Sequence, residues 1–316
     1  MCLIAVAADA PGPWLLVVAA NRDEFHDRHA APAAWWSGTR KRILAGRDLQ
    51  GGGTWLGLQL SADGRRLRLA ALTNLRPGLM PVPDTPAADL VPPSRGRLAA
   101  GFLLSDREPL SFLQTLDPPP GAYAGFNLLA AQLARSDGVD VGYLNNLPGT
   151  LPRRLGRGVH VVSNATLGVE WPKTRLLGTA LAAASARAGS GASVPADAGK
   201  AMAERPDAMG DADRLAAALL VALADRTPAP AAELPRTGLD PARERLLSAP
   251  FIVDDQYGTR CSTVIIVGRD GTVSFTEARF GPAGRALGTV RERFRLAWDG
   301  GGLPGRLTPR AGEAPR

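Results

Sequence analysis

The chain has 316 residues, of which 45% are hydrophobic, so it can bury a substantial core in one large or two ordinary domains. Its formal charge is +7, but the basic residues are scattered and the longest basic run lies in "TRKR" at 39–42, which argues against nucleic-acid binding. Two cysteines are too few for a disulfide framework, and the sequence has no CxxC or HxxxH motif that would indicate a zinc site.

Targeting signals are not evident in the sequence. No basic segment followed by an apolar core begins the chain, and no stretch reaches the roughly 18–20 apolar residues of a membrane span. We therefore expect a cytoplasmic protein without stable membrane insertion. The oligomeric state stays open.

The first predicted element is a β-hairpin, in which the apolar runs 2–8 and 14–20 flank a Pro/Gly turn. Further strands are predicted at 54–60, 67–74, 126–133, 159–164, 262–268 and 272–278. Helical patterns occupy 94–105, 173–188, 211–226 and 240–249. Because most strands do not alternate with helices, we expect a mainly antiparallel α+β fold with helices packed on sheet faces.

One domain is expected over residues 1–298. An Ala/Gly/Ser/Pro-rich stretch at 185–210 is typical of a loop or linker between helices. Residues 299–316 lack core-forming side chains, which predicts a disordered tail.

A dense polar cluster, "NRDEFHDR" at 21–28, follows the second apolar run. If the hairpin turns around Pro11, Cys2 lies opposite Ala20, and the cluster sits around the start of the chain. Removal of Met1 would then leave a thiol and a free α-amine on Cys2, and the amine could act as the base for the thiol.

Two members of the cluster could assist such a thiol. A guanidinium at Arg22 would lower the pKa of the Cys2 thiol, and a carboxylate at Asp23 could hold either Arg22 or the ammonium group. The same pattern is equally typical of an inert buried cysteine beside a surface ion pair.

Three other stretches carry weaker signals. "GRDLQGGGTWLGL" at 46–58 has neither dinucleotide-binding nor P-loop spacing, so we expect a flap or tight turn with Asp48 and Trp55 at the rim of a site, or a turn before a buried Trp. Trp35 and Trp36 could line an apolar pocket or cap a core edge. His26 and His29 favour a solvated turn over a metal site.

Seven segments between residue 1 and about 268 resemble the NRDE family, also called the transport and Golgi organisation 2 family. They are "MCLIAVA", "ANRDEF", "ILAGRDLQGGGTWLGL", "AALTNLRPG", "SRGRL", "HVVSNATLGVEWPKTR" and "YGTRCSTVIIV". This family is similar to N-terminal nucleophile hydrolases of the choloylglycine hydrolase and penicillin V acylase type. The resemblance implies a four-layer αββα sandwich of two antiparallel sheets between helix layers.

The resemblance also implies site residues. The catalytic cysteine corresponds to Cys2, and the assisting Arg and Asp correspond to Arg22 and Asp23. In the hydrolases two residues separate that Arg and Asp, so Glu24 stays an alternative to Asp23. Oxyanion-hole asparagines correspond to Asn74 and Asn164, and a late arginine corresponds to Arg260. An Asn side chain is a suitable neutral donor to the oxyanion of a tetrahedral intermediate.

These residues predict a hydrolase that cleaves a linear amide, or related carbon–nitrogen bond, of a small molecule and requires no metal or cofactor. The alternative is a non-catalytic carrier that holds haem, acyl-CoA or another lipid in the same cleft, as the resemblance to eukaryotic family members suggests. For haem, the candidate axial ligands are Cys2, His26, His29 and His160. The sequence does not determine the substrate.

Overall fold

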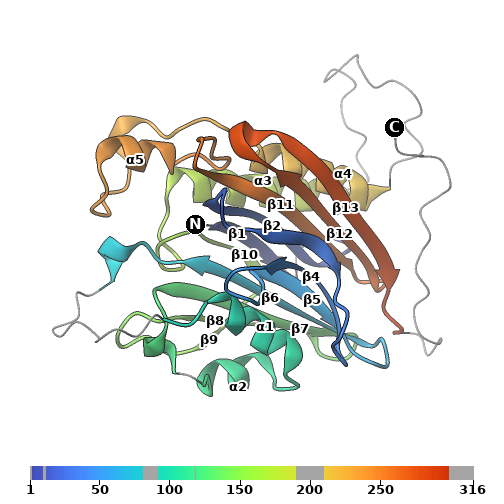
Figure 1. Cartoon of the computed structure of the whole chain (residues 1–316). Coiled ribbons are helices and arrows are strands. Elements are labelled where there is room, and N and C mark those ends of the chain that lie inside the picture. The colour runs from blue at the N-terminus through green and yellow to red at the C-terminus, as the bar shows by residue number, and fades with distance from the viewer. Residues whose placement is uncertain (1, 10–11, 81–91, 118, 190–209, 299–316) are drawn as a thin grey trace, which may run out of the picture.

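The computed structural model describes residues 2–9, 12–80, 92–117, 119–189 and 210–298 (Figure 1). Its strands form two sheets. The first sheet has the order β10 (Gly158–Val162), β1 (Cys2–Ala8), β2 (Trp14–Phe25), β11 (Tyr257–Gly268), β12 (Thr272–Phe280) and β13 (Ala286–Arg295). The second has the order β3 (Ala30–Trp35), β4 (Arg42–Asp48), β5 (Leu56–Leu60), β6 (Arg66–Asn74), β7 (Phe126–Ala134), β8 (Gly138–Asn145) and β9 (Arg153–Leu155).

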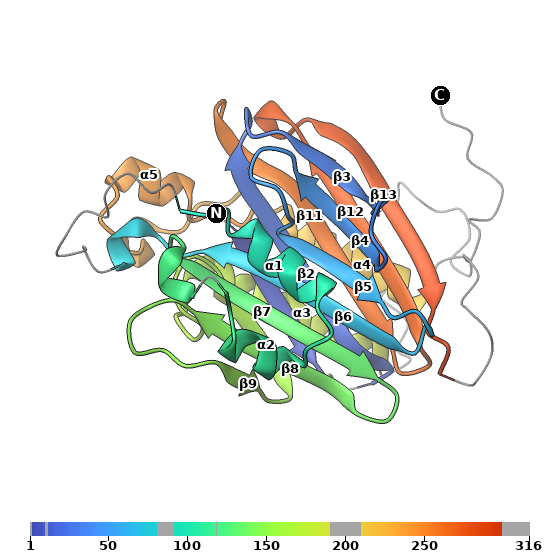
Figure 2. The same cartoon turned by 60° about the horizontal axis from the view of Figure 1, so that its bottom comes forward.

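The helices cover the faces of the sheets that point away from each other (Figures 1 and 2). Helices α3 (Pro172–Gly189) and α4 (Asp211–Leu223) pack against the first sheet. Helices α1 (Gly96–Leu104) and α2 (Pro109–Gln114) pack against the second. Helix α5 (Pro241–Leu246) lies in the segment that leads to β11.

Strand alternation explains this arrangement. Ile4 and Val18 belong to the core shared with the second sheet, whereas Leu3 and Val17 pack on α3 and α4. Because successive side chains of a strand point to opposite faces, the nearly continuous apolar runs of β1 and β2 bury both faces. The prediction of mainly antiparallel sheets with packed helices is confirmed, since every strand pairing in the described residues is antiparallel.

The predicted register of the first hairpin was wrong. Cys2 pairs with Arg22 instead of Ala20, because the turn is wider and closes with a hydrogen bond from the Asp9 amide to the Leu15 carbonyl at 2.8 Å. The register differs from the prediction by two residues, so each side chain keeps its face. Cys2 and Arg22 therefore both point toward the second sheet.

The end of the second strand also differs from the prediction. Strand β2 continues to Phe25, through the polar cluster, because β11 pairs with it as far as Tyr257. Six elements were not predicted, namely β3, β4, β8, β9, β13 and α2. In β13 most side chains are exposed, so its sequence lacks the apolar run of a buried strand.

Other predictions fall partly outside the described residues. The expected linker at 185–210 is helical as far as Gly189, the end of α3, and residues 190–209 lie outside the described part. The expected tail at 299–316 lies outside it as well. Among the described helices, none has the length and apolar character that crossing a bilayer would require.

Candidate functional site

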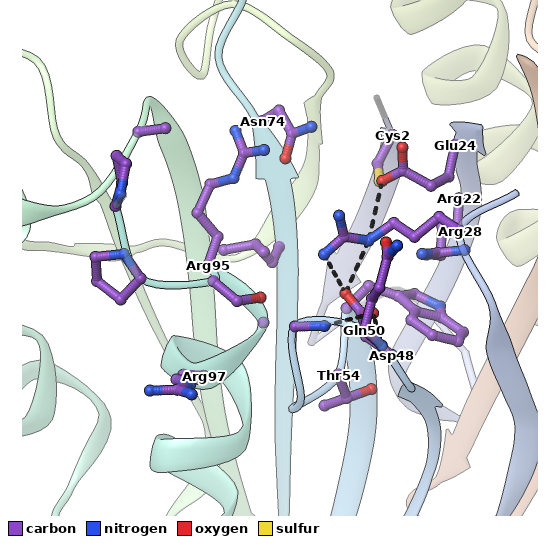
Figure 3. A pocket seen from close by; sticks show the side chains of 18 of the residues that line it. Cys2, Arg22, Glu24, Arg28, Asp48, Gln50, Thr54, Asn74, Arg95 and Arg97 are labelled. Atoms are coloured by element: carbon purple, nitrogen blue, oxygen red, sulfur yellow. Dashed lines mark hydrogen bonds and ion pairs between the residues drawn. The ribbon is translucent and has the colours of Figure 1, made fainter. Parts of the chain in front are cut away.

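A cavity of about 710 Å³ lies where β1 and β2 meet the end of β6 and the start of α1 (Figure 3). Cys2, Arg22 and Glu24 come from the first sheet, and Asn74 lies across the cavity from them. The remaining lining residues are Asp23, Arg28, Asp48, Gln50, Gly51, Thr54, Trp55, Leu72, Pro92, Pro93, Ser94, Arg95, Gly96, Arg97 and Ala124.

Cys2 lies in the wall of this cavity and is 8% exposed. Burial raises the pKa of its thiol above the ordinary value, and the Asp23 carboxylate acts in the same direction. The Arg22 guanidinium and a hydrogen bond from the Asp23 main chain oppose this rise in pKa. The main chain of Cys2 is held by a hydrogen bond, in which the Ser163 hydroxyl donates to the Cys2 carbonyl at 3.0 Å.

Arg22 is the register partner of Cys2 on one side and of Cys261 on the other. Its guanidinium lies over the ring of Trp55, 4.4 Å from the ring centroid. Its Nη1 is buried and has no hydrogen-bond partner among the described residues. A cation held beside a thiol in this way favours the thiolate, because thiolate stability depends on nearby positive charge.

The two acidic candidates lie on opposite faces of β2. Asp23 points toward the helix-covered face, where its Oδ1 accepts a hydrogen bond from the Thr259 hydroxyl at 2.7 Å. Burial raises the pKa of its carboxyl group. Glu24 points toward the second sheet, and its Oε2 lies 3.8 Å from Nε of Arg28.

Lys173 is a buried neighbour of this site that the sequence analysis did not single out. It is 2% exposed, and its Nζ donates to the Leu247 carbonyl at 2.9 Å. Burial lowers its pKa to about 8, while the Asp23 carboxylate acts to raise it. The residue lies in the quoted segment "WPKTR", but only the packing of α3 reveals that it is buried beside Asp23.

The structure separates the other predicted residues. Asn74 lines the cavity, whereas Asn164 is fully buried behind it and donates from Nδ2 to the Asn74 carbonyl at 3.0 Å. Arg260 does not line this cavity; its Nη1 donates to the carbonyls of Phe25 at 2.6 Å and His26 at 3.2 Å. Cys2, Arg22, Asp23 and Asn74 are thus brought together around one cavity.

The glycine-rich segment forms part of the opposite wall. Asp48 and Trp55 both line the cavity, as predicted for its rim. Asp48 accepts hydrogen bonds from the amides of Gln50 and Gly51, and Nη2 of Arg28 lies 2.6 Å from its Oδ2. These contacts hold the segment as a tight turn.

Two further arginines of the cavity, Arg95 and Arg97, were not predicted, although both lie in the quoted segment "SRGRL". Nη1 of Arg95 donates to the Gly125 carbonyl at 3.0 Å, and burial lowers the pKa of this guanidinium. Arg97 is exposed at the rim. Neither makes an ion pair among the described residues.

The histidines proposed as haem ligands do not line this cavity. Nε2 of His26 lies 3.1 Å from the Asp254 carbonyl, and Nε2 of His160 lies 2.7 Å from the Gly156 carbonyl. His29 is exposed. In the described part of the chain, no group of three or more His, Cys, Asp or Glu side chains is arranged to hold a metal ion.

Comparison with known proteins gives a consistent result. Residues 1–282 match the family described as Transport and Golgi organisation 2. A Transport and Golgi organization protein 2 homolog from Bos taurus is 34% identical over 308 residues, which cover 94% of this chain and 99% of that protein. The homolog from Homo sapiens is 34% identical over 296 residues, which cover 88% and 92% of the two chains.

Similar solved structures are more distant. Anbu from Hyphomicrobium sp. strain MC1 has a TM-score of 0.31 at 9% identity, covering 92% of this chain and 87% of that one. Anbu (ancestral beta-subunit) from Yersinia bercovieri has a TM-score of 0.25 at 10% identity, covering 59% and 75%. The extended sequence matches carry the assignment and confirm the predicted family: this chain belongs to the Transport and Golgi organisation 2 family.

Proposed function

We propose that this protein is a cysteine hydrolase of the N-terminal nucleophile type that cleaves a linear amide bond of a small molecule. The observation that carries the proposal is the position of Cys2, in the wall of a 710 Å³ cavity with Arg22 as its register partner. Helices on the outer faces of two antiparallel sheets support assignment to the four-layer αββα sandwich of such enzymes.

The proposed reaction begins once Met1 has been removed. The α-amine of Cys2 takes the thiol proton, and the thiolate forms a bond to the amide carbonyl carbon. The carbon–nitrogen bond then breaks, the amine leaves with the proton from the α-ammonium group, and a thioester remains on Cys2. Water, deprotonated by the same α-amine, hydrolyses the thioester and releases the carboxylic acid and the free thiol.

The surrounding residues have distinct proposed roles. Arg22 stabilises the thiolate, and the Asn74 side-chain amide, which lies across the cavity, donates to the oxyanion of the tetrahedral intermediate. Asn164 is a positioning residue, because its side chain holds the main chain of Asn74.

We assign the supporting carboxylate to Asp23 instead of Glu24. Asp23 anchors the end of β2 to β11 through two buried contacts, from the Thr259 hydroxyl to its carboxylate and from the Tyr257 hydroxyl to its carbonyl. Glu24 instead forms an ion pair with Arg28 on the cavity side of the strand.

The test begins with untagged protein and a panel of acyl p-nitroanilides. Intact mass should show that Met1 is absent, and substrates that turn over should leave a transient acyl adduct on the protein. Cys2→Ala should abolish both turnover and adduct. Cys261→Ala is the matched control, because this second cysteine is also buried and burial also raises its pKa.

Three outcomes would contradict the hydrolase. They are retention of Met1, equal loss of activity in the two cysteine variants, and turnover that survives an N-terminal extension. Ligand binding that tolerates both the extension and Cys2→Ala, without turnover, would favour the haem or acyl-CoA carrier instead.

A further inference from the structure

A second pocket, of about 1030 Å³, lies at the other end of β6 from the Cys2 cavity. Asn74 ends β6 at the cavity, whereas Arg66 and Arg68 lie near its start and line the second pocket. Arg68 faces α1, since its guanidinium lies 4.0 Å from the ring centroid of Phe102. The two pockets share no lining residue.

The floor of this pocket holds a buried positive charge. Arg68 is 5% exposed, and its Nη1 donates to the Gln132 side-chain oxygen at 2.9 Å. Its Nη2 donates to the carbonyls of Phe102 and Arg107, at the end of α1. These acceptors are neutral, and Arg68 makes no ion pair among the described residues.

The rim adds further positive charge. Arg40, Arg42 and Arg66 are exposed and form no ion pair in the described part of the chain. Lys41 is paired with Asp106. Five cationic side chains thus line the pocket against two carboxylates, which are Asp63 and Asp106.

This pocket contains the longest basic run of the sequence. The "TRKR" segment at 39–42 joins β3 to β4, and its three basic residues meet Arg66 and Arg68 from the next hairpin. Planar guanidinium groups match the oxygen geometry of phosphate, and several of them around a concave site favour a dianion over a monoanion.

We propose that this pocket binds the phosphate group of a phosphate monoester. A smaller adjoining pocket, of about 280 Å³, shares Arg40, Lys41 and Arg42 and also contains Trp35 and Trp36. The two tryptophans offer an apolar surface for the part of the ligand that carries the phosphate. The phosphate source is either a soluble metabolite or a lipid headgroup.

The buried guanidinium supplies a physical reason for binding. The carboxylates of Glu108 and Asp106 act on Arg68 only from a distance, since its direct hydrogen-bond acceptors are neutral. A buried charge without a direct ion pair is costly, and an anion in the pocket would reduce that cost. Burial lowers the pKa of Arg68 to about 10, so this residue is still charged at neutral pH. Ligand binding should therefore also raise the melting temperature.

The experiment titrates the untagged full chain with phenyl phosphate by calorimetry, at constant ionic strength. Arg40→Ala combined with Arg66→Ala removes two rim charges and should weaken binding at least tenfold. Arg153→Ala combined with Arg154→Ala removes two exposed charges from β9 and is the matched control, in which binding should change by less than about twofold. Alkylation of Cys2 should be unchanged in both.

A second arm identifies the source of the phosphate. Sedimentation with phosphatidylcholine vesicles, with and without phosphatidate, tests the lipid headgroup. Binding of either probe that is lost in the Arg40 and Arg66 double variant supports the site, and the probe that binds identifies the source. Absence of binding to both probes, or equal loss in the two double variants, would overturn the proposal.

Discussion

Cys2 and Arg22 are register partners on adjacent strands, and both side chains face the space between the two sheets. Cys261 flanks Arg22 on its other side, so one guanidinium lies between two thiols. Of the two cysteines, Cys2 alone lines the cavity of about 710 Å³. Strand β2 therefore lies between a cysteine that a small molecule in the cavity can reach, Cys2, and one that does not line the cavity, Cys261.

Replacing Arg22 should change the reactivity of Cys2. Because the guanidinium lowers the pKa of the thiol, Arg22→Ala should slow alkylation of Cys2 at neutral pH about tenfold, the effect of one pKa unit. Arg22→Lys keeps the charge and should alkylate several times faster than Arg22→Ala. The measurement is the rate of iodoacetamide labelling by intact mass. Equal rates in the wild type and Arg22→Ala would show that the cation does not act on the thiol.

The pH profile of labelling should depend on the N-terminus. With Met1 retained by an N-terminal extension, burial keeps the pKa of the Cys2 thiol raised, so labelling should stay slow at neutral pH and increase only above the ordinary thiol range, about 8.5. A chain that has lost Met1 should label at lower pH, because the α-amine is then on Cys2 itself. Identical profiles for the two chains would contradict the proposed base.

Lys173 should make stability depend on pH in the alkaline range. Its folded pKa of about 8 lies below the value near 10.5 of an unfolded lysine, so between these values the unfolded chain binds a proton that the folded chain does not. Stability should therefore increase with pH across this window, relative to Lys173→Met, by about 3 kcal/mol. Urea unfolding of both chains at pH 7, 9 and 10.5 measures this difference. A difference that stays constant with pH would refute the buried, destabilised ammonium group.

A buried ion pair holds α5 against the end of β6. Arg76 pairs with Glu244, and their side chains are 1% and 4% exposed. Arg76→Met leaves the carboxylate buried without its partner, so the free energy of unfolding should fall by about 3–5 kcal/mol.

The exposed pair between Arg175 and Glu233 provides the control. Arg175→Ala should change the free energy of unfolding by about 0.5 kcal/mol or less. Chemical denaturation measures the free energy of unfolding of both variants and shows whether the loss depends on burial of the ion pair or on the pairing of charges alone. Similar losses in both would contradict the role assigned to burial.

Gly53 fixes the wall of the Cys2 cavity. Its φ is +82°, and a Cβ there would lie 2.3 Å from the Gly96 carbonyl oxygen at the start of α1. Gly52 has a φ of +69°, but a Cβ there would meet nothing within 4 Å. Gly53→Ala should therefore destabilise the protein more than Gly52→Ala, which carries only the backbone penalty of about 1 kcal/mol. The melting temperatures of the two variants measure this difference. Equal decreases would show that the turn accommodates the Gly53→Ala side chain without a steric penalty.

Sequence patterns were sufficient to predict the long apolar strands and the family. Apolar runs of strand length predicted β1, β5, β6, β7, β11 and β12, because strands buried on both faces need continuous apolar sequence. The resemblance to the family, which rests on spaced motifs, predicted that Cys2, Arg22 and Asn74 belong to one site, and the structure places all three in the lining of one cavity.

The contacts of those residues depend on how distant segments of the chain pack together. A strand pattern does not contain the register that pairs Cys2 with Arg22, because the turn length sets it. Likewise, whether Lys173 and Arg68 are buried depends on helices that pack from distant parts of the chain. Charged residues usually lie on the surface, so only the surrounding fold shows where a charge is held away from water.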